Sequence, residues 1–431
     1  MSITLRAYVF FAVLCLVGIA GQWTGGSGPH FWRILAVAFV VALVLEWALA
    51  RRWSIVLDRD LPQRAYLGRP LSYRLLIGNR SHRSIQLEAV EWYPDTIEAR
   101  QDTLQQNIRP QGTGIETLNV TPTRLGEITW DRLYCRIAGL LGMANWNRRL
   151  SHRKSVKVVP DHLHLAETKM GSQNSGDLNR RRYGSGLELI GLRDYQPGDA
   201  LRSIDWKATA RSGRHTVRVF TEEQRLELTL LVDAGRRSAL QAGALTRLGH
   251  YANVAARLAE KTILEGNTVN LICFSDQVLT TVYHAKGRTG LLRLRAALEK
   301  LRPQETDSNM LPAVFEARQR TRQRNLMVLL TDMDEASTDS QLIKATGLLV
   351  PKHLPLVASI LDDETAMLES RFAHSWLDPY TTMAAHESLL DSRRAALYLQ
   401  RKGAHVVYAR PSKLDKEVMT YYGRLLERNR L

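Results

Sequence analysis

The stretch LELTLLVDA, residues 226–234, decides the fold of the C-terminal half of the chain. Its apolar residues run almost continuously up to Asp233, which is typical of a strand buried on both faces of a parallel sheet. A second run, NLMVLLTDMD at residues 325–334, has the same character and passes into Asp332. Ligands bind at the carboxyl ends of the strands in such sheets, so we expect both aspartates at one functional edge.

Segments with helical spacing alternate with apolar runs from this point to the end of the chain. Helices are predicted at residues 244–266, 389–403 and 414–429, and further strands at 269–274, 354–361 and 404–409. This alternation predicts an α/β domain over residues 226–431, an open, mostly parallel sheet with helices on both faces.

Two apolar runs at the N-terminus predict a transmembrane helical hairpin over residues 1–52. They cover residues 7–23 and 31–50, and the second has the roughly 20 residues that a helix needs to span the hydrocarbon core. Arg51 and Arg52 follow the second run, so the positive-inside rule places the rest of the chain in the cytoplasm. The alternative for the first run is a cleaved signal peptide.

Residues 53–160 show alternation of apolar and polar residues instead of helical spacing. LSYRLLIGN at residues 71–79 and GEITWDRLYCRI at residues 126–137 carry the clearest examples. Alternation bounded by turn residues predicts short antiparallel strands, and a small β-sandwich is the expected fold. Residues 161–225 then form a linker and signature segment, with a mobile, polar and basic part up to residue 185.

The composition indicates an anionic partner without identifying its kind. A net charge of +16 favours nucleic acid, anionic lipid or an acidic protein. The three cysteines are scattered through apolar runs, so free thiols and a reducing compartment are expected. No GxxxxGK[ST] loop, HExxH pair or nucleic-acid recognition motif occurs in the sequence, and no small-molecule substrate is indicated.

The strand–aspartate pattern resembles a von Willebrand factor A-type domain, whose metal site uses Asp-x-Ser-x-Ser after the first strand. Here that run is DAGRR at residues 233–237, so glycine and arginine replace both serines. The resemblance implies a Mg²⁺ site at Asp233 and Asp332, with Thr306 as a further ligand. Because glycine offers no side-chain ligand and arginine repels a divalent cation, we expect a degenerate site in which Arg237 pairs with one of the aspartates. The alternative is that both aspartates cap following helices.

The stretch GLRDYQPGDALRSIDWKATARSG, residues 191–213, is dense in charged, aromatic and turn residues. With the preceding GLE it resembles the signature of the domain of unknown function 58 family, which combines Gly-x-Glu, Arg-x-Tyr-x-x-Gly-Asp and Ile-Asp-Trp-Lys-x-x-Ala-Arg. The matching residues are Glu188, Arg193, Tyr195, Asp199, Arg202, Asp205, Trp206, Lys207 and Arg211. The resemblance implies a membrane protein that works with a MoxR-type AAA+ ATPase.

Three roles are open for this signature. Its charges nearly cancel, which favours an internal ion-pair network that fixes the β segment against the α/β sheet, so that Asp205→Ala would destabilise the whole soluble part. Aromatic residues among arginines favour a strip that docks a partner. The third role is an active site, although Ser203 has no histidine closer than His215 and no nucleophile–base arrangement is evident.

The residues and the resemblance together predict a non-enzymatic scaffold or adaptor that acts through protein–protein interaction. It would be a multi-pass protein of the bacterial inner (cytoplasmic) membrane, with both termini and the soluble domains in the cytoplasm. A MoxR-type ATPase is the expected partner, in complex assembly or envelope maintenance, and Mg²⁺ is the one cofactor considered. The alternatives are a basic binder of anionic lipid or nucleic acid, and a metal-dependent enzyme.

Overall fold

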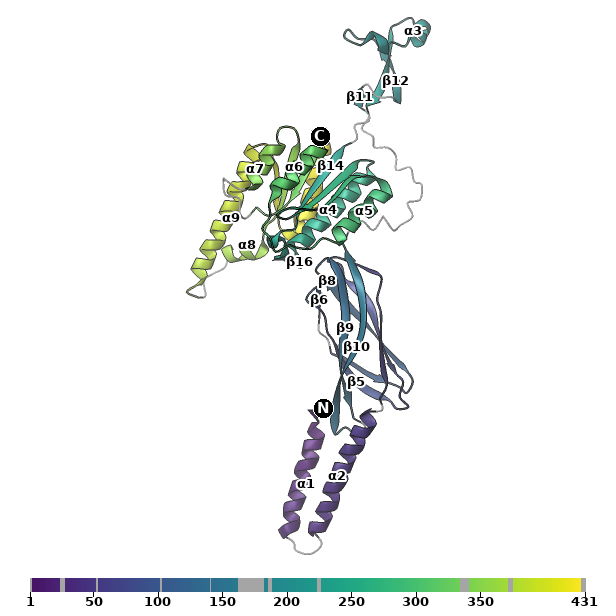
Figure 1. The fold of residues 1–431 in the computed structure, drawn as a ribbon, viewed down its shortest axis with the longest axis vertical. Helices are drawn as coiled ribbons and strands as arrows, with labels where there is room; N and C mark the ends of the chain where they lie inside the picture. The colour runs from purple at the N-terminus through teal and green to yellow at the C-terminus, as the bar shows by residue number, and fades with distance from the viewer. Residues whose placement is uncertain are drawn as a thin grey trace. The chain divides into compact units, whose positions relative to one another are not determined.

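The computed structural model describes residues 2–23, 28–51, 53–100, 103–139, 141–161, 182–184, 188–222, 226–333, 341–370 and 375–427. The chain divides into two compact units, Met1–Val159 and Pro160–Leu431. The architecture is mixed α/β, with antiparallel strand pairs in both units (Figure 1).

Two helices follow the short strand β1, Ser2–Ile3, in the first unit: α1, Leu5–Trp23, and α2, Gly28–Arg51. The stretch Trp32–Ala50 within α2 is long and apolar enough to cross a membrane, whereas the apolar part of α1, Leu5–Ala20, is shorter. The described residues therefore contain one candidate membrane span near the N-terminus, which supports association with a membrane.

Two sheets follow in the first unit. The larger has the strand order β1-β10-β9-β5-β7, with β3 beside β10, and the smaller has the order β2-β4-β8-β6. Their bounds are β1 Ser2–Ile3, β2 Ile55–Asp60, β3 Arg64–Tyr66, β4 Leu71–Asn79, β5 Ile85–Glu91, β6 Ile97–Ala99, β7 Leu104–Ile108, β8 Thr113–Pro122, β9 Gly126–Ala138 and β10 Ala144–Val159. Alternate residues of both sheets meet in one core, among them Leu75, Ile77, Leu87, Leu133 and Ile137.

The alternation changes phase inside β9. Ile128 and Trp130 are buried, and the next buried residue is Leu133 rather than a residue two positions on. The pairing of β9 with β10 shifts register between Ser151 and Lys154 at the same level. This irregularity, in which β10 has one residue more than β9, lies at the level where the burial of β9 changes phase.

A six-stranded sheet forms the centre of the second unit, in the order β18-β17-β14-β19-β20-β21. The strands are β14 Glu227–Asp233, β17 Thr268–Phe274, β18 Val278–Ala285, β19 Leu326–Leu330, β20 Leu354–Ile360 and β21 His405–Ala409. All neighbours pair in parallel except β17 with β18, which is antiparallel and lies at one edge. The edge strand β18 was not predicted, because its half-exposed residues lack the continuous apolar run of a strand buried on both faces.

Helices pack on this sheet in two groups. The helices are α4 Arg247–Leu264, α5 Gly287–Glu299, α6 Met310–Arg320, α7 Gln341–Leu349, α8 Asp363–Ser370, α9 Asp378–Arg401 and α10 Pro411–Glu427. Val314 of α6, Ala345 of α7 and Leu399 of α9 share one core cluster with the sheet. Helices α4 and α10 meet elsewhere, where the hydroxyl of Thr262 donates to Tyr422 at 3.1 Å.

The signature segment is folded. Strands β11 Arg182–Gly184, β13 Thr216–Glu222 and β12 Glu188–Asp194 form a three-stranded antiparallel sheet. Between β12 and β13 lie the short 3₁₀ turn η2, Leu201–Ser203, and helix α3, Trp206–Ser212. We call β12, η2, α3 and β13 the signature hairpin. Most of the linker predicted from residue 161 to 185 lies outside the described residues.

Candidate functional site

Asp233 ends β14 at the carboxyl edge of the central sheet and is 6% exposed. Its Oδ1 accepts hydrogen bonds from the backbone N–H of Gly235 at 2.9 Å and from the hydroxyl of Ser308 at 2.5 Å. Its Oδ2 accepts a bond from the hydroxyl of Thr331 at 2.6 Å. These donors compensate the buried carboxylate, so it needs no cation to be stable there.

Asp332 follows β19 at the same edge and is held by two arginines. Its Oδ2 lies 3.2 Å from Nε of Arg237, and it also pairs with Nη1 of Arg247. The Asp332 side chain is 10% exposed, that of Arg247 5% and that of Arg237 30%. The pair of Arg237 with Asp332 is one of the two pairs that the sequence left open, whereas the pair of Arg247 with Asp332 was not expected.

These residues do not fit a divalent cation. Two guanidinium groups already supply the positive charge next to Asp332, and three neutral donors occupy the oxygens of Asp233. Among the described residues, no cluster of three or more His, Cys, Asp or Glu side chains could hold a metal ion. Hard cations such as Mg²⁺ need several free oxygen ligands, so the donor set favours the arginine-held arrangement.

Gly235 explains how Ser308 reaches the carboxylate. A Cβ at position 235 would lie 2.2 Å from Oγ of Ser308 and 3.1 Å from the carbonyl oxygen of Thr306. A serine at this position would therefore collide with the segment that supplies the hydroxyl. Thr306 itself donates its hydroxyl to Oδ1 of Asp276 at 3.1 Å, and not to either site aspartate. Hydrogen bonds from Ser275 and Thr306 lower the pKa of Asp276.

Asp233 does not cap a helix, although helix capping was the alternative to a metal site. The residue that caps the following 3₁₀ turn η3, Arg236–Ala239, is Gly235, which makes no side-chain bond. Helix α4 is capped by Thr246, whose hydroxyl accepts from the N–H of Gly249 at 3.2 Å. Asp233 instead ties strand ends and loops together at the sheet edge.

The signature hairpin carries two ion pairs at its surface. Arg193 binds Asp199 through two hydrogen bonds of 2.5 and 2.7 Å, and this contact lowers the pKa of Asp199. Asp205 caps α3 by accepting from the N–H groups of Lys207 and Ala208, both at 3.0 Å. Its Oδ2 accepts from Nε of Arg218 at 3.0 Å, and the bonds from Ala208 and Arg218 lower its pKa.

The sequence analysis favoured an internal ion-pair network here. In the structure the side chains of Asp199 and Asp205 are 18% and 17% exposed, whereas their arginine partners are about half exposed, so the pairs lie at the surface. The side chains of Arg193 and Arg218 are 41% and 48% exposed. Tyr195 is half-buried, with its ring edge-on to that of His215 at 6.4 Å. Glu188 begins β12, and nothing is described of its side chain.

The remaining signature residues face solvent. Trp206 is 65% exposed and the neighbouring Leu201 is 70% exposed. Arg202, Lys207 and Arg211 are also exposed, and none of them forms an ion pair with a described residue. Exposed aromatic and aliphatic side chains beside arginines are typical of contact surfaces, so the hairpin geometry favours docking over a buried network.

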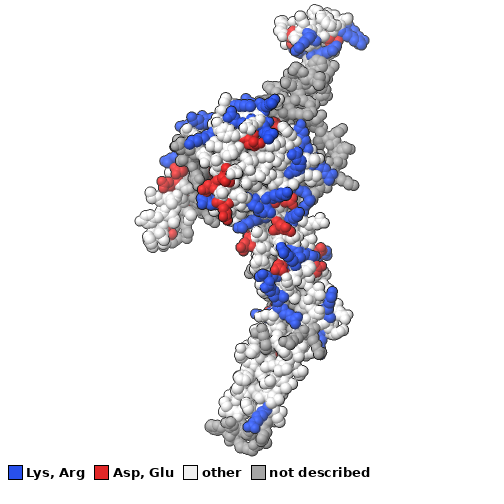
Figure 2. Space-filling model, viewed as in Figure 1, with Lys and Arg blue, Asp and Glu red and all other residues white. Residues whose placement is uncertain are grey.

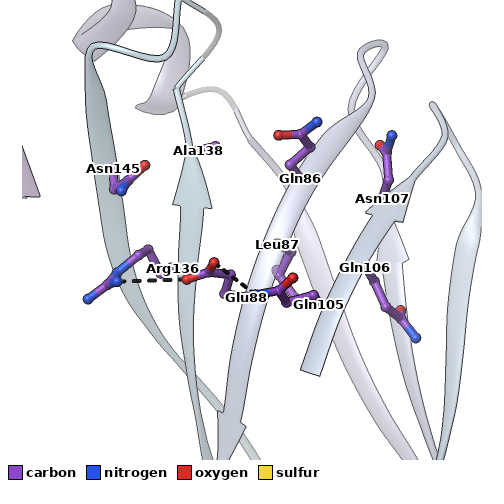
Figure 3. A pocket seen from close by; sticks show the side chains of 9 residues that line it. All are labelled: Gln86, Leu87, Glu88, Gln105, Gln106, Asn107, Arg136, Ala138 and Asn145. Atoms are coloured by element: carbon purple, nitrogen blue, oxygen red, sulfur yellow. Dashed lines mark hydrogen bonds and ion pairs between the residues drawn. The ribbon is translucent and has the colours of Figure 1, made fainter. Parts of the chain in front are cut away.

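A further polar pocket of about 400 Å³ lies on the outer face of the large sheet of the first unit (Figure 3). Glu88 is at its centre, 3.7 Å from Nη1 of Arg136 and within 3.3 Å of Nε2 of Gln105. Arg136 and Glu88 are 54% and 45% exposed, so the pair is solvated and contributes little to stability. The sequence analysis did not single out this pocket, because its residues come from separate strands.

The second unit thus combines a mostly parallel α/β sheet, whose carboxyl edge is held by arginines, with a solvent-exposed signature hairpin. The family model described as "Protein of unknown function DUF58" matches residues 191–370. This range contains Asp233, Asp332 and the signature from Arg193 to Arg211, and the match confirms the DUF58 part of the resemblance. No curated protein matches the chain.

Two solved structures show only distant likeness. A CARDB domain from Pyrococcus furiosus, solved in complex with di-metal ions, is 14% identical, with 25% of this chain and 89% of that chain covered and a TM-score of 0.19. Native alpha-2-macroglobulin from Escherichia coli is 15% identical, with 25% of this chain and 17% of that chain covered and a TM-score of 0.21. Neither likeness carries a functional argument.

Proposed function

We propose that this protein is a membrane-anchored scaffold whose second unit binds protein partners in the cytoplasm. The candidate span Trp32–Ala50 supports the anchor. Arg51 and Arg52 directly after the span favour a cytoplasmic location for the residues that follow, and α1 would return the N-terminus to the same side.

The observation that carries the proposal is the occupation of both site carboxylates by protein groups. Asp233 accepts three hydrogen bonds and Asp332 pairs with Arg237 and Arg247, so protein groups use most of the acceptor positions that a metal ion or a substrate proton would need. Carboxyl edges of parallel sheets are where such domains bind ligands. An edge whose two central carboxylates are already bonded by protein groups is suited to contact with a protein surface, in a domain of the von Willebrand factor A-like type.

Exposed charges surround this edge and would make the contact. Arg236 Nη2 pairs with Oδ1 of Asp307 at 2.9 Å, and their side chains are 66% and 77% exposed. The partner we propose is a MoxR-type AAA+ ATPase, which rests on the DUF58 resemblance. Rim charges of this kind affect partner choice and association rate more than affinity.

The test is affinity purification of the full chain, in detergent, from its native host in the presence of a slowly hydrolysed ATP analogue. Recovery of an AAA+ protein with the unchanged chain, and its loss with Arg236→Glu, would support the proposal. Arg394→Glu is the matched control, because Arg394 is 73% exposed on α9 and pairs with Asp391 one turn away. Failure to recover any AAA+ protein under these conditions would refute the partner.

The second candidate is a charge-driven binder of anionic lipid or nucleic acid, which the net charge of +16 favours. Liposome and gel-shift assays over a salt series separate it from a scaffold. Charge-driven binding weakens steeply with salt, so salt-insensitive binding would exclude it.

A further inference from the structure

Two surfaces of the second unit expose large apolar side chains, and the first is on the signature hairpin. Its exposed apolar residues are Leu192 at 50%, Leu201 at 70% and Trp206 at 65%. Residues 200–215 contain four Lys or Arg and one acid, Asp205, which is paired with Arg218. The charges of the whole hairpin nearly cancel, but its part between the two strands, residues 200–215, is basic and exposes apolar side chains, and in Figure 2 blue atoms gather near this end.

The second surface is on the helix pair α8–α9. Its exposed apolar residues are Met367 at 69%, Trp376 at 77%, Leu377 at 49%, Tyr380 at 68% and Met383 at 70%. The first buried residue of α9 is Ala385, so the opening turns of this helix make no core contact. Figure 1 shows this end of α9 extending away from the central sheet.

The α8–α9 surface is acidic in a chain that is otherwise basic. Residues 362–387 contain six Asp or Glu and one Arg. Glu369 is 2.8 Å from Nδ1 of His386, which holds α8 to α9, and Asp363 is 3.4 Å from Nε of Arg410. Even with these contacts the surface keeps a clear excess of negative charge.

Exposed apolar surface of this kind indicates a binding partner. Contiguous Trp, Tyr, Leu and Met side chains on a surface mark interaction sites, and opposite charge around them sets the orientation of the partner. The hairpin surface and the α8–α9 surface match each other in both respects. A membrane of anionic lipid would attract the first surface and repel the second, so it would leave the α8–α9 surface uncovered.

We propose that the hairpin surface of one copy of this chain docks on the α8–α9 surface of a second copy. Because each copy carries one of each surface, repetition of the contact closes a reciprocal dimer or a ring, or builds a linear array. Trp206 and Leu201 would contact the apolar group around Trp376 and Tyr380, while Lys207 and Arg211 face the acids of α8 and α9. This self-association uses neither Asp332 nor Arg236, so it does not depend on the scaffold's proposed ATPase partner.

The experiment is sedimentation of the full chain in detergent over a range of protein concentrations. The unchanged protein should form dimers or larger species as its concentration rises. One variant, Leu201→Ser with Trp206→Ser, removes the hairpin surface, and another, Trp376→Ser with Tyr380→Ser, removes the α8–α9 surface. Each variant alone should be monomeric, with association weakened at least about tenfold.

The mixture of the two variants is the decisive measurement. Each retains one intact surface, so an equal mixture should form a heterodimer that does not grow further. Phe315→Ser is the control, because Phe315 is 49% exposed on α6 outside both surfaces, and it should leave assembly unchanged. Raising the salt concentration from about 0.05 M to about 0.5 M should weaken assembly because the charges are screened.

Three results would overturn the proposal: a monomer at every concentration, assembly of either variant as strong as that of the unchanged protein, or a mixture that stays monomeric. If both surfaces docked within one copy, the protein would be a monomer at every concentration. If the hairpin bound only lipid, the protein would again be a monomer at every concentration, and the mixture of variants would stay monomeric. Circular dichroism of each variant checks that it is folded. ATPase recovery, measured separately, should be the same for these variants and the unchanged chain.

Discussion

Replacement of Asp332 by asparagine tests the arginine-held sheet edge most directly. The change keeps the shape of the side chain but removes the charge that Arg237 and Arg247 share. The Arg247 side chain is only 5% exposed, so its guanidinium would lose its carboxylate where water cannot replace it. Removal of one partner of a buried ion pair costs about 3–5 kcal/mol of unfolding free energy.

A loss of this size lowers the melting temperature of a domain of this size by on the order of 10 °C. Because the chain has two units, the melt is best followed by hydrogen exchange of β14 and β19 together with calorimetry of the full chain. Asp307→Asn is the control, since Asp307 is 77% exposed and its pair with Arg236 is solvated, so its melting temperature should be unchanged.

A second substitution separates lost charge from lost packing. In the variant with Asp332→Asn and Arg247→Met, no arginine is left buried without a carboxylate at this position. Its melting temperature should recover at least about half of the loss, because the two effects are coupled. Equal melting temperatures of Asp332→Asn and the unchanged protein, or strictly additive effects in the double variant, would refute an ion-pair lock at this edge.

Four further outcomes are expected. Titration with Mn²⁺ should show no micromolar binding by calorimetry, and such binding abolished by Asp233→Ala would restore the metal site. Arg59→Met should lower the free energy of unfolding of the first unit by about 3–5 kcal/mol, as measured by urea unfolding. The reason is that Arg59 and Glu91 are buried 2.7 Å apart, and burial raises the pKa of Glu91. Adding Glu91→Leu should restore most of the lost unfolding free energy. His353 is 2% exposed, and burial lowers its pKa to about 4 in the folded protein. Since the pKa of histidine in the unfolded chain is about 6.5, the unfolded chain binds more protons below that pH. The free energy of unfolding should therefore fall by up to about 3 kcal/mol as the pH is lowered from 6.5 to 4. His353→Leu should flatten this pH dependence, and an unchanged slope would contradict it. Asp205→Ala should speed hydrogen exchange of α3 alone and leave the melting of the central sheet unchanged, whereas a melting shift of the whole second unit would favour the clamp.

Much of the fold could be predicted because buried strands and helices have recognisable patterns of apolar residues in the sequence. Continuous apolar runs predicted the central strands that end near Asp233 and Asp332, and alternation predicted strands β4 and β9. The half-exposed strand β18 and the short helix α8 have no comparable pattern of apolar residues. The strands of the signature segment were not predicted, because they are short and rich in polar residues.

The candidate site divides in the same way. Its aspartates were found from the strand ends, and Arg237 from its position in the DAGRR run. Ser308, Thr331 and Arg247 were missed, since they lie 75, 98 and 85 residues from the carboxylates that they bind. Arg218 was missed for a similar reason, 13 residues from Asp205 and across a hairpin. Patterns in a single sequence indicate which residues lie close together along the chain. These contacts join residues that are far apart along the chain, so such patterns do not predict them.

The sequence by itself therefore determined which segments are apolar, which strand ends carry aspartate and that the chain carries a DUF58 signature. Only the tertiary structure decided what those aspartates and signature charges do. Burial and partner choice are properties of packed neighbours, and they assign Asp332 to two arginines, Asp233 to three neutral donors and the signature ion pairs to the surface. The same folding exposes Trp206 and Trp376, which local sequence could not distinguish from core residues.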